Sequence, residues 1–401
     1  MSTSNSSLLT PHRLLITGGC GFIGLNLIKF LIHKGYQNLR ILDNLSIGTR
    51  KSLESLLSEL GTFTKKETKN QVNYSLDSSA CPVKSGGHLT GVLSSPRGIH
   101  ANEEQSGFHR GPNHVELVIG DIRNREECMK ATEGIDALVH LAAHAGVIPS
   151  IGDPFFDFDT NALGTLNLLH AAVNNKVDSF IFASSNAPLG NQAPPLCEGK
   201  IPKPLSPYGA SKLSCEGYCS AFYGSYGLRT VILRFSNVYG PYCLPKESVI
   251  AKFIKDGIPK RELTVYGDGA QTRDFIHVDD LCQAIHLCLS ALANSQLTNQ
   301  QITINGKVSG ETFHLGTGKE TSILELAQLI QGFFDTKIKI SFAAERKGEI
   351  KRNYSDITKA KKILGFCPQI SLKDGVESVY KWFIDKDADQ IKQAAALSGS
   401  E

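Results

Sequence analysis

A glycine-rich turn between an apolar run and an amphipathic stretch constrains the fold of this chain more than any other feature. Residues 14–16 are apolar and lead into Thr17-Gly18-Gly19-Cys20-Gly21-Phe22-Ile23-Gly24. Residues 22–34 then carry apolar side chains at helical spacing, and a second apolar run, 39–42, ends at Asp43. A buried parallel strand, a tight turn, a helix and a second strand in this order predict a βαβ unit whose turn approaches a phosphate group.

Each part of this unit suits one part of a dinucleotide. The glycines let the backbone turn tightly and come close to a pyrophosphate, while the start of the helix offers N–H groups and a positive dipole end. The carboxylate of Asp43 can accept hydrogen bonds from a ribose and would repel a 2′-phosphate, so NAD is favoured over NADP. The predicted site comprises Gly18, Gly21, Phe22, Ile23, Gly24 and Asp43.

The composition restricts the class of protein and its partners. The chain has 401 residues, of which 41% are hydrophobic and 20% charged, as in ordinary globular proteins. The net charge of +3 gives no electrostatic reason to expect nucleic acid or an acidic membrane surface. The ten cysteines are scattered without metal-ligand spacing, and residues 1–11 lack the basic start and apolar core of a signal peptide. We therefore expect a cytoplasmic protein without a bound metal, a nucleic-acid partner or a membrane partner.

Strand-like apolar runs alternate with amphipathic stretches through the first half of the chain. The runs lie at 115–119, 137–141, 180–183 and 228–234. Such alternation predicts an α/β fold with a doubly wound parallel sheet, covered by helices on both faces.

Two polar segments interrupt this alternation. Residues 61–113 are rich in Ser, Gly, Asn, Lys and His and show no sustained period, so we expect a structureless insertion there. Residues 294–309 look similar. The simplest interpretation of either segment is a tolerated surface insertion.

A tyrosine and a lysine four positions apart form the first catalytic candidate. Tyr208 and Lys212 lie on one face if this segment is helical, and Ser206-Pro207 suits the N-cap and first turn of such a helix. An ammonium group beside a phenol favours the phenolate, so we expect the pKa of Tyr208 to fall from about 10 toward neutrality. The side chain could then exchange a proton with a sugar hydroxyl.

A serine at the end of a strand is the second catalytic candidate. Residues 180–183 predict a strand that ends at Ser184-Ser185, and open parallel sheets bind ligands at the carboxyl ends of their strands. Ser185 could hydrogen-bond the reacting oxygen and relay its proton to Tyr208. Serine also favours turns after strands, so this position taken alone is not diagnostic.

Together these residues resemble the extended short-chain dehydrogenase/reductase family, and within it the nucleotide-sugar 4-epimerases of the UDP-glucose 4-epimerase type. The resemblance covers about residues 13–381 outside the two polar segments. It is carried by ordered motifs, namely Thr17 to Gly24, Asp43-Asn44-Leu45-Ser46, Gly120-Asp121-Ile122-Arg123, His140-Leu141-Ala142-Ala143, Asn161-Ala162-Leu163-Gly164-Thr165, Tyr208 to Lys212, Leu233 to Pro241 and Arg273 to Val278.

The resemblance implies a role for each matching residue. The catalytic set would be Ser185, Tyr208 and Lys212. The cofactor, NAD, would be bound by Gly18, Gly21, Phe22, Ile23, Gly24, Asp43, Asn44, Asp121, Ile122, Leu141, Ala142, Ala143, Asn161, Tyr208 and Lys212. The nucleotide sugar would be bound by Ser185, Asn237, Arg273, Arg346 and Glu349, and arginine forks suit phosphate oxygens.

The resemblance also implies a two-domain architecture, in which a Rossmann sheet is joined by a smaller C-terminal α/β substrate-binding domain. The NAD-binding domain would comprise 12–235, with the insertion at 61–113, and would also receive 274–293 and 310–318. The nucleotide-sugar-binding domain would comprise 236–273 and 319–385, with flexible tails at 1–11 and 386–401. A homodimer built on the helices near 161–174 and 208–223 is expected.

The reaction implied is an inversion at C4 without net redox change. Tyr208, as phenolate, would remove the proton from the sugar O4 while the C4 hydride passes to NAD. The resulting 4-keto sugar would turn in the pocket and receive the hydride on its other face. The cofactor is regenerated and should stay tightly bound.

Alternatives within the family are a 4,6-dehydratase, a decarboxylase and a 4-keto-sugar reductase. Dehydratases carry an Asp-Glu pair after the catalytic hydroxyl, and decarboxylases a glutamate, where this chain has Asn186-Ala187. A reductase would need exchangeable NADPH, which Asp43 opposes. A non-enzymatic NAD-sensing protein would not need Tyr208 and Lys212.

The serine motif departs from the epimerase pattern, because Leu189 replaces the usual aromatic residue before Gly190. Asn353 matches the family's pocket gate, where a tyrosine would exclude an N-acetyl group. The sugar could therefore be glucose, N-acetylglucosamine or glucuronic acid, linked to UDP.

Overall fold

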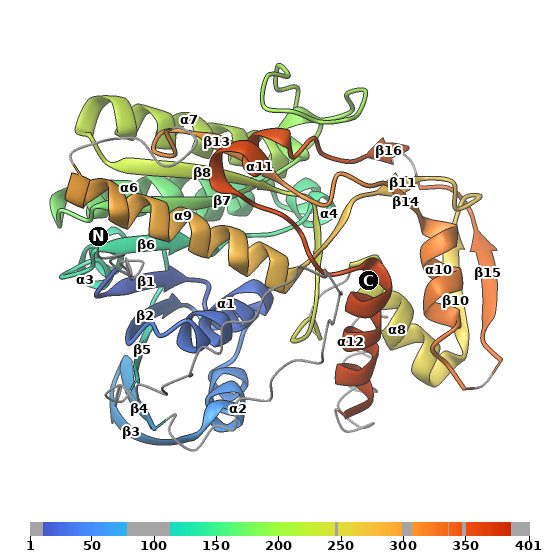
Figure 1. The fold of residues 1–401 in the computed structure, drawn as a ribbon, viewed down its shortest axis with the longest axis horizontal. Coiled ribbons are helices and arrows are strands. Elements are labelled where there is room, and N and C mark those ends of the chain that lie inside the picture. Colours follow the sequence, from blue (N-terminus) through green and yellow to red (C-terminus); the bar gives the residue numbers. More distant parts are fainter. Residues whose placement is uncertain are drawn as a thin grey trace, which may run out of the picture.

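The computed structural model describes residues 11–77, 113–244, 248–298, 307–335, 337–346 and 350–385. Its described residues form a central sheet of nine strands (Figure 1). Across the sheet the strands are β13 (Thr312–Leu315), β8 (Arg229–Phe235), β7 (Ser179–Ser185), β6 (Ala137–His140), β1 (Leu14–Thr17), β2 (Asn38–Asp43), β5 (Asn113–Ile119), β4 (Gln71–Asp77) and β3 (Thr62–Thr68). The strands from β13 to β5 pair in parallel, and β4 and β3 continue the sheet in antiparallel pairing.

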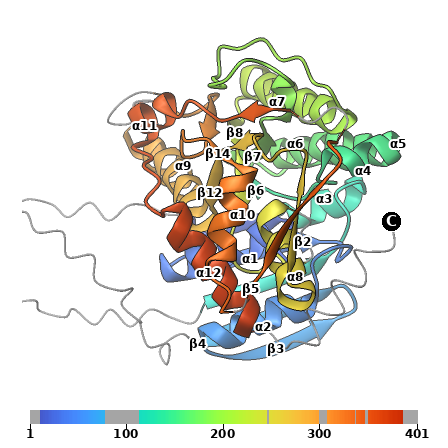
Figure 2. The ribbon, with the colours of Figure 1, turned by 90° about the vertical axis from the view of Figure 1, so that its right-hand side faces the viewer.

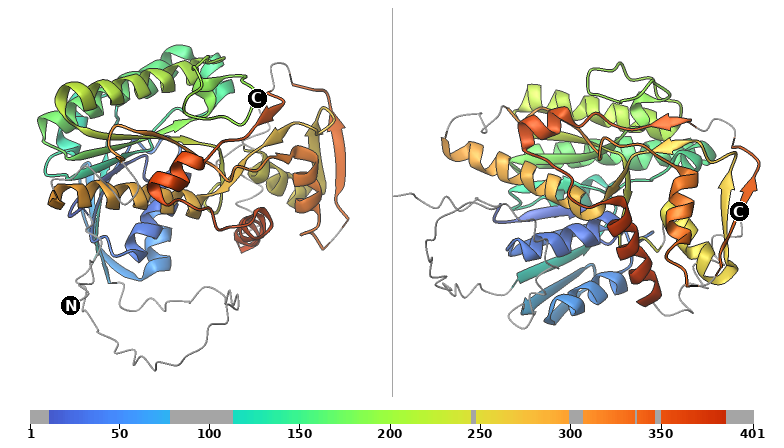
Figure 3. Two further views of the ribbon diagram at one scale, coloured as in Figure 1. Left: turned by 45° about the horizontal axis from the view of Figure 1, so that its top comes forward. Right: turned by 45° about the vertical axis from the view of Figure 1, so that its right-hand side comes forward.

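Helices cover both faces of the sheet, as Figure 3 shows. One face packs against α1 (Phe22–His33), α2 (Arg50–Leu60), α9 (Val278–Thr298) and α11 (Thr358–Leu364). The other packs against α3 (Arg125–Ala131), α6 (Gly164–Asn174) and α7 (Pro207–Tyr226). The doubly wound parallel sheet predicted from the sequence is thus confirmed.

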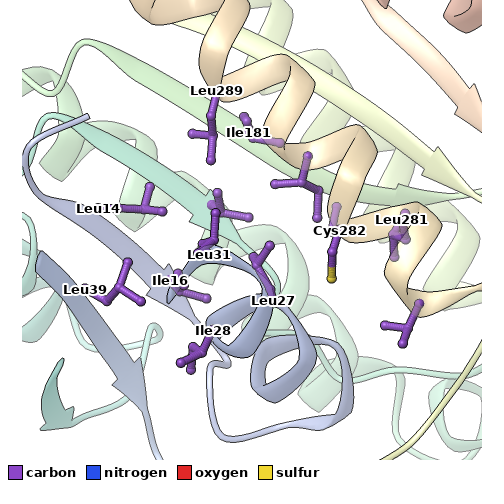
Figure 4. Close-up of a cluster of buried hydrophobic side chains, with 14 of the residues drawn as sticks. Leu14, Ile16, Leu27, Ile28, Leu31, Leu39, Ile181, Leu281, Cys282 and Leu289 are labelled. Carbon is purple, nitrogen blue, oxygen red and sulfur yellow. The ribbon is translucent and has the colours of Figure 1, made fainter. Parts of the chain in front are cut away.

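The two cores meet at the central strand β1. Leu14 and Ile16 point into the core beneath α1 and α9, whereas Leu15 between them points into the core beneath α6 and α7. Figure 4 shows Leu14 and Ile16 on the side of the sheet that carries Leu27 of α1 and Leu289 of α9. All of these side chains are fully buried. Because both faces are covered, the strand has to be a continuous apolar run rather than an alternating one.

The expectation of a structureless segment at 61–113 is wrong for residues 62–77, which form the antiparallel strands β3 and β4. Val72, Tyr74 and Leu76 alternate with exposed or half-exposed residues and are themselves almost fully buried. This period of two is the strand signal that the polar composition obscured. β4 pairs with β5 in the register Val72 to Leu117. Residues 78–112 lie outside the described part of the chain.

Two further boundaries differ from the sequence predictions. Helix α9 extends into the polar segment 294–309 and ends at Thr298. Residues 299–306 are not described. Ile357, Ala360 and Phe366 belong to the core under α1 and α9, so the segment around α11 returns to the large domain instead of remaining in 319–385. The predicted tails fall outside the described residues, apart from Pro11. None of the helices in the described ranges is long and apolar enough to cross a membrane.

A smaller α/β domain lies beside the carboxyl ends of the strands and faces the viewer in Figure 2. Its core is formed by α8 (Val249–Lys260), α10 (Ile323–Gln331), α12 (Leu372–Asp385) and the parallel strands β10 (Glu262–Tyr266) and β15 (Lys339–Ala343). Short strand pairs link it to the large sheet, namely β9 (Asn237–Tyr239) with β12 (Phe275–His277), and β11 (Thr272–Arg273) with β14 (Thr321–Ser322) and β16 (Arg352–Asn353).

The strand order reverses direction between β1 and β6. The chain moves from β1 outward to β2 on one side, and β6 begins the outward run to β7 and β8 on the other. Open α/β sheets bind ligands in the crevice outside such a switch point, at the carboxyl ends of the strands. The glycine turn after β1 and the loop after β6 meet there.

Candidate active site

Two glycines of the turn, Gly18 and Gly24, have no room for a side chain. Gly18 has a positive φ of 69°, and a Cβ on it would lie 2.8 Å from the backbone of Ala142 in the loop after β6. A Cβ on Gly24, in the first turn of α1, would lie 2.5 Å from the carbonyl oxygen of Gly18. The start of α1 at Gly21 has no side-chain cap. The turn is therefore a backbone cradle at a helix N-terminus, which is the form of a pyrophosphate site.

Asp43 closes this turn from the end of β2. One carboxylate oxygen accepts the backbone N–H of Cys20 at 2.9 Å, and the other accepts that of Leu45 at 2.8 Å. The side chain is buried, and burial raises the pKa of Asp43 although both hydrogen bonds oppose the shift. A carboxylate oxygen can accept more than one hydrogen bond, so Asp43 can still bind a hydroxyl.

Residues after β2 and β5 form a second polar group. The Asn44 amide donates to Asp121 at 3.0 Å, and the Arg123 guanidinium donates to the same carboxylate at 2.8 Å. The hydrogen bond from Arg123 is the main reason why the pKa of Asp121 falls to about 2. Next to it, Ile122 is buried against Gly164 of α6. The structure thus brings Asn44, Asp121 and Ile122 together beside the turn.

The loop after β6, which contains Leu141, Ala142 and Ala143, is fixed by hydrogen bonds to neighbouring segments. The backbone N–H of Ala142 donates to Thr17 Oγ1 at 3.2 Å. Asn161, which lies in the π-helical segment η1 (Asp159–Leu163), continues this support. Its amide oxygen accepts the N–H of His144, and its nitrogen donates to the carbonyl of His144 and to Asp157. The Asn161 side chain is therefore bonded entirely within the protein, where it fixes the loop.

Ser185, Tyr208 and Lys212 come together where β7 ends and α7 begins. Ser206 caps α7 by accepting the N–H of Gly209 at 3.1 Å, and Pro207 is its first residue, as the sequence predicted. The Ser185 hydroxyl hydrogen-bonds to Tyr208, and it accepts the backbone N–H of Ala187 at 3.1 Å.

The pKa of Tyr208 differs from its prediction. Burial raises the pKa of Tyr208 to about 12, whereas the hydrogen bond from Ser185 acts in the opposite direction. The Lys212 ammonium lies 5.9 Å from the ring centre of Tyr208 and donates instead to the carbonyl of Ala183 at 2.8 Å. Burial also lowers the pKa of Lys212. The expected fall of the Tyr208 pKa is thus absent in the protein alone, because desolvation outweighs the hydrogen bond from Ser185.

A buried ion pair lies beneath this site. Arg234 of β8 binds Glu216 of α7 through two hydrogen bonds of 2.9 and 2.6 Å, and Ser184 donates to Glu216 at 2.5 Å. All three side chains are buried. The pair ties α7 to β7 and β8 and so sets the position of the helix that carries Tyr208 and Lys212.

A pocket in the smaller domain contains three predicted substrate residues. Asn237 of β9, Arg273 of β11 and Arg346 after β15 all line it, although they are far apart in the sequence. The Arg346 guanidinium stacks on the ring of Tyr266 at 3.8 Å. Glu349, the fourth predicted residue of this group, lies outside the described residues.

Sequence reasoning missed the aromatic and apolar part of this pocket. Tyr266, Phe253 and Ile250 line it together with Gln271. The run Val265-Tyr266-Gly267, which precedes Arg273 by a short turn, was an available signal. The membership of Phe253 and Ile250 follows from the packing of α8 and has no local signature.

Comparison with known proteins places the chain in a family. Residues 84–304 match the model of the NAD dependent epimerase/dehydratase family. The chain belongs to this family. A putative UDP-glucose 4-epimerase of Methanocaldococcus jannaschii is 31% identical over 374 residues, which are 92% of this chain and 97% of the relative. A dTDP-glucose 4,6-dehydratase of Streptomyces niveus is 31% identical over 71% of this chain and 81% of its own length.

Solved structures of the family have the same fold. A UDP-glucose 4-epimerase from Thermotoga maritima, crystallised with UDP-glucose, matches with a TM-score of 0.70 and 28% identity, over 93% of this chain and 99% of that one. The family consists of enzymes that act on nucleotide sugars, and the chain resembles both an epimerase and a dehydratase at 31% identity, over 92% and 71% of its length. The choice between the two reactions has to come from the site itself.

Proposed function

We propose that this family member is an NAD-dependent 4-epimerase that inverts C4 of a UDP-sugar of the glucose, N-acetylglucosamine or glucuronate class through a transient 4-keto sugar. The observation that carries the proposal is the chemistry directly after Ser185. Neither Asn186 nor Ala187 can donate a proton to a leaving hydroxyl or take one from C5. Asn186 is also buried, with its amide bonded to other side chains.

The glycine turn supports NAD as the bound cofactor. A Cβ on Gly18 would collide with the backbone of Ala142, and a Cβ on Gly24 with the backbone of Gly18 and Gly19. The turn is thus bare backbone at the start of α1, where a phosphate could lie against N–H groups. Asp43 and Asn44 would hold the adenosine ribose, and Asp121 and Ile122 the adenine. Bound NAD supplies a hydride acceptor that becomes the donor for the return step.

The residues of the chain would supply the proton chemistry. Tyr208 removes the proton from the sugar O4 and later returns it. The hydrogen bond from Ser185 stabilises the phenolate, because it lowers the pKa of Tyr208 against the effect of burial. Lys212, fixed by the carbonyl of Ala183, would bind the nicotinamide ribose with its remaining ammonium protons.

The pocket of the smaller domain fits the nucleotide end of the substrate. Its volume of about 240 Å³ is smaller than the roughly 300–1,000 Å³ that sites for drug-sized ligands enclose, so it suits part of a nucleotide sugar. Arg273 and Arg346 would bind the diphosphate oxygens. Asn237, which lines the same pocket, and Glu349, which is not among the described residues, would complete this group.

A homodimer is supported by the outer surface of the helices around the site. Phe155 of α5 (Pro154–Phe158) is 82% exposed, and Phe158 and Tyr218 are exposed nearby. On α7, Gly217 and Gly224 have nothing within 4 Å of a Cβ position. A second copy of α7 could approach this small-residue face closely, as in a four-helix bundle.

Product analysis tests the proposal. The purified protein is given UDP-glucose, UDP-N-acetylglucosamine and UDP-glucuronic acid in turn, with NAD and no reductant, and the products are identified by proton NMR. We expect a C4-inverted sugar that reaches one equilibrium ratio from either side. Loss of water or carbon dioxide, or an accumulating 4-keto sugar, would refute the epimerase. A Tyr208→Phe variant should abolish turnover and still bind UDP.

A further inference from the structure

Asn186, the residue that separates this chain from the dehydratase pattern, is the centre of a buried hydrogen-bond network. Its amide nitrogen donates to Asn353 Oδ1 at 3.2 Å and to Ser355 Oγ at 3.1 Å. Its amide oxygen lies 2.9 Å from His314 Nδ1 on β13. Asn186 is 6% exposed, and His314 and Ser355 are fully buried. The network therefore joins the end of β7 to β16 of the smaller domain.

The His314 end of the network fixes the orientation of the Asn186 amide. His314 stands in register with Arg234 on the neighbouring strand, and burial together with this guanidinium lowers the pKa of His314 to about 3. The ring is neutral, so only one nitrogen carries a proton. Its Nε2 is buried without a hydrogen-bond partner among the described residues, so a proton on Nε2 would bury an unpaired N–H group. The proton therefore lies on Nδ1 and is donated to the Asn186 oxygen.

The opposite end of the network demands the same orientation. The buried Asp274 carboxylate accepts the Ser236 hydroxyl at 3.4 Å, in addition to several backbone N–H groups. Because Ser236 gives its proton to Asp274, Ser355 must donate to Ser236 across their 2.9 Å contact. The Ser355 oxygen is left to accept from Asn186. The neutral His314 ring at one end and the Asp274 carboxylate at the other thus both direct the Asn186 NH₂ group toward Asn353.

The orientation of Asn353 follows from that of Asn186. Its amide oxygen has to face the Asn186 NH₂ group, so its own NH₂ group points away. Within the described part of the chain, that NH₂ group has no hydrogen-bond acceptor, and the side chain is only partly buried. Asn353 is in register with Arg273 of the neighbouring strand β11, and Arg273 lines the nucleotide pocket. A sugar that joins a diphosphate at Arg273 to the hydroxyls of Ser185 and Tyr208 has to pass Asn353.

We propose that Asn186 is a positioning residue that turns the Asn353 amide so that an N–H donor faces the sugar, which gives preference to a sugar whose substituent presents a carbonyl or carboxylate oxygen. This inference rests on the proposed function, since it takes the sugar to lie between the nucleotide pocket and Tyr208. The two sources of such an oxygen are an acetamido group and a uronate carboxylate. Glucose offers hydroxyl groups alone.

Equilibrium binding to variants tests this proposal without requiring turnover. Two preference ratios are measured. Each is the dissociation constant for UDP-glucose divided by that for UDP-N-acetylglucosamine or for UDP-glucuronic acid, so a high ratio means a preference over glucose. Asn186→Asp cannot donate to Asn353, so the Asn353 amide should turn round and present its oxygen to the sugar. We expect at least one ratio to fall about five- to tenfold, the effect of one hydrogen bond. Binding of UDP alone should stay within twofold and reports that the variant is folded.

A double-mutant cycle separates positioning from a direct effect of the new charge. Asn353→Leu, of similar size, removes the donor and should lower the same ratio to the same extent. Adding Asn186→Asp to Asn353→Leu should then have no further effect. An equal fall in both backgrounds would overturn the proposal. So would ratios unchanged by Asn353→Leu, a variant that tests the inference even where Asn186→Asp does not fold. The product NMR measurement tests C4 inversion separately, so either idea can fail alone.

Discussion

Ser185 and Ser184 are adjacent serines with different partners, which implies a catalytic role for the first in the proposed reaction and a structural role for the second. Ser185 hydrogen-bonds to Tyr208 and lowers its pKa, whereas Ser184 is buried against Glu216. The phenolate is the active form of Tyr208 in the proposed reaction. Any loss of the Ser185 hydrogen bond therefore reduces the fraction of active enzyme at neutral pH.

Ser185→Ala should lower kcat about 10- to 100-fold at pH 7, because a hydrogen bond to a charged group is worth about 1.5–3 kcal/mol. The pKa of Tyr208 rises in this variant, so the proton is lost at higher pH. The deficit should therefore shrink as pH increases. A pH–rate profile of kcat measures this. Ser184→Ala is the matched control, and an identical profile for the two variants would contradict the assigned roles.

The grouping of the proposed catalytic residues was predictable from the sequence, but their electrostatics were not. The spacing of Tyr208 and Lys212 on a helix follows from their positions alone, and the structure has that helix. The pKa of Tyr208 depends on burial, which is created by side chains distant in the sequence. The role of Asn186 was invisible for the same reason, since His314 and Ser355 come from segments far along the chain.

The turn from β1 into α1 is the element that we propose binds the pyrophosphate of the cofactor. A Cβ on Gly24 would lie 2.5 Å from backbone atoms of Gly18 and Gly19, which cannot move aside cheaply. A Cβ on Gly21 would meet only the Gly18 oxygen, at 3.3 Å. Gly24 is therefore required for the packing of the turn, whereas Gly21 leaves space open beside it.

Gly24→Ala should reduce the free energy of unfolding by about 1–3 kcal/mol, as overpacking does in a tight interior. Gly21→Ala should change the free energy of unfolding by less than about 0.5 kcal/mol. It should nevertheless weaken NAD binding, because its methyl group would enter the proposed phosphate site. Urea denaturation and a fluorescence titration with NAD measure the two effects. Equal destabilisation by both substitutions would argue against this geometry.

Strand β13 carries a histidine that makes folding pH-dependent. The ordinary pKa of histidine is 6.5, and that of His314 in the folded protein is about 3. Below pH 6.5 the unfolded chain therefore takes up a proton at His314 that the folded chain does not. The contribution to stability is fully present above pH 6.5 and is lost as pH falls toward 3.

Between pH 7 and pH 5 the wild-type protein should lose about 2 kcal/mol more stability than His314→Gln, which has no titrating group there. Denaturant unfolding at both pH values measures the difference. Taking the difference between the two proteins cancels the other buried histidines. A constant difference across this range would show that the His314 pKa is not lowered.

The elements themselves were largely predictable where their pattern was strong. The alternating strands and helices of the large sheet match the predicted runs to within a few residues. The hairpin β3–β4 was missed, because polar side chains on its exposed face conceal three buried positions at a period of two. The segment around α11 was assigned to the wrong domain, since only tertiary packing places Ile357 against the large sheet.

The described residues form a large sheet domain and a smaller domain that share one proposed substrate, and α7 lies along the outer edge of the large domain (Figure 1). Gly217 on that helix has open space around its Cβ position. A larger side chain there would leave the single chain undisturbed and would separate two copies of α7.

Gly217→Arg should convert a dimer, at twice the 43.5 kDa of one chain, into a monomer of 43.5 kDa. Its unfolding free energy per chain should not fall on account of helix formation, since arginine favours helices more than glycine does. Light scattering after size exclusion gives the mass. Gly199→Arg, at an equally open position in a loop, should remain dimeric. A monomeric wild-type protein would refute the dimer outright.

The fate of the C4 hydrogen decides whether the whole site works as proposed. UDP-sugar labelled with deuterium at C4 is incubated with the protein and NAD in ordinary water, and the product is read by NMR and mass spectrometry. An epimerase that takes and returns the same hydride gives inverted product with the deuterium still at C4. Deuterium that moves to C6 with loss of water, or that washes out into solvent, would contradict the proposed reaction.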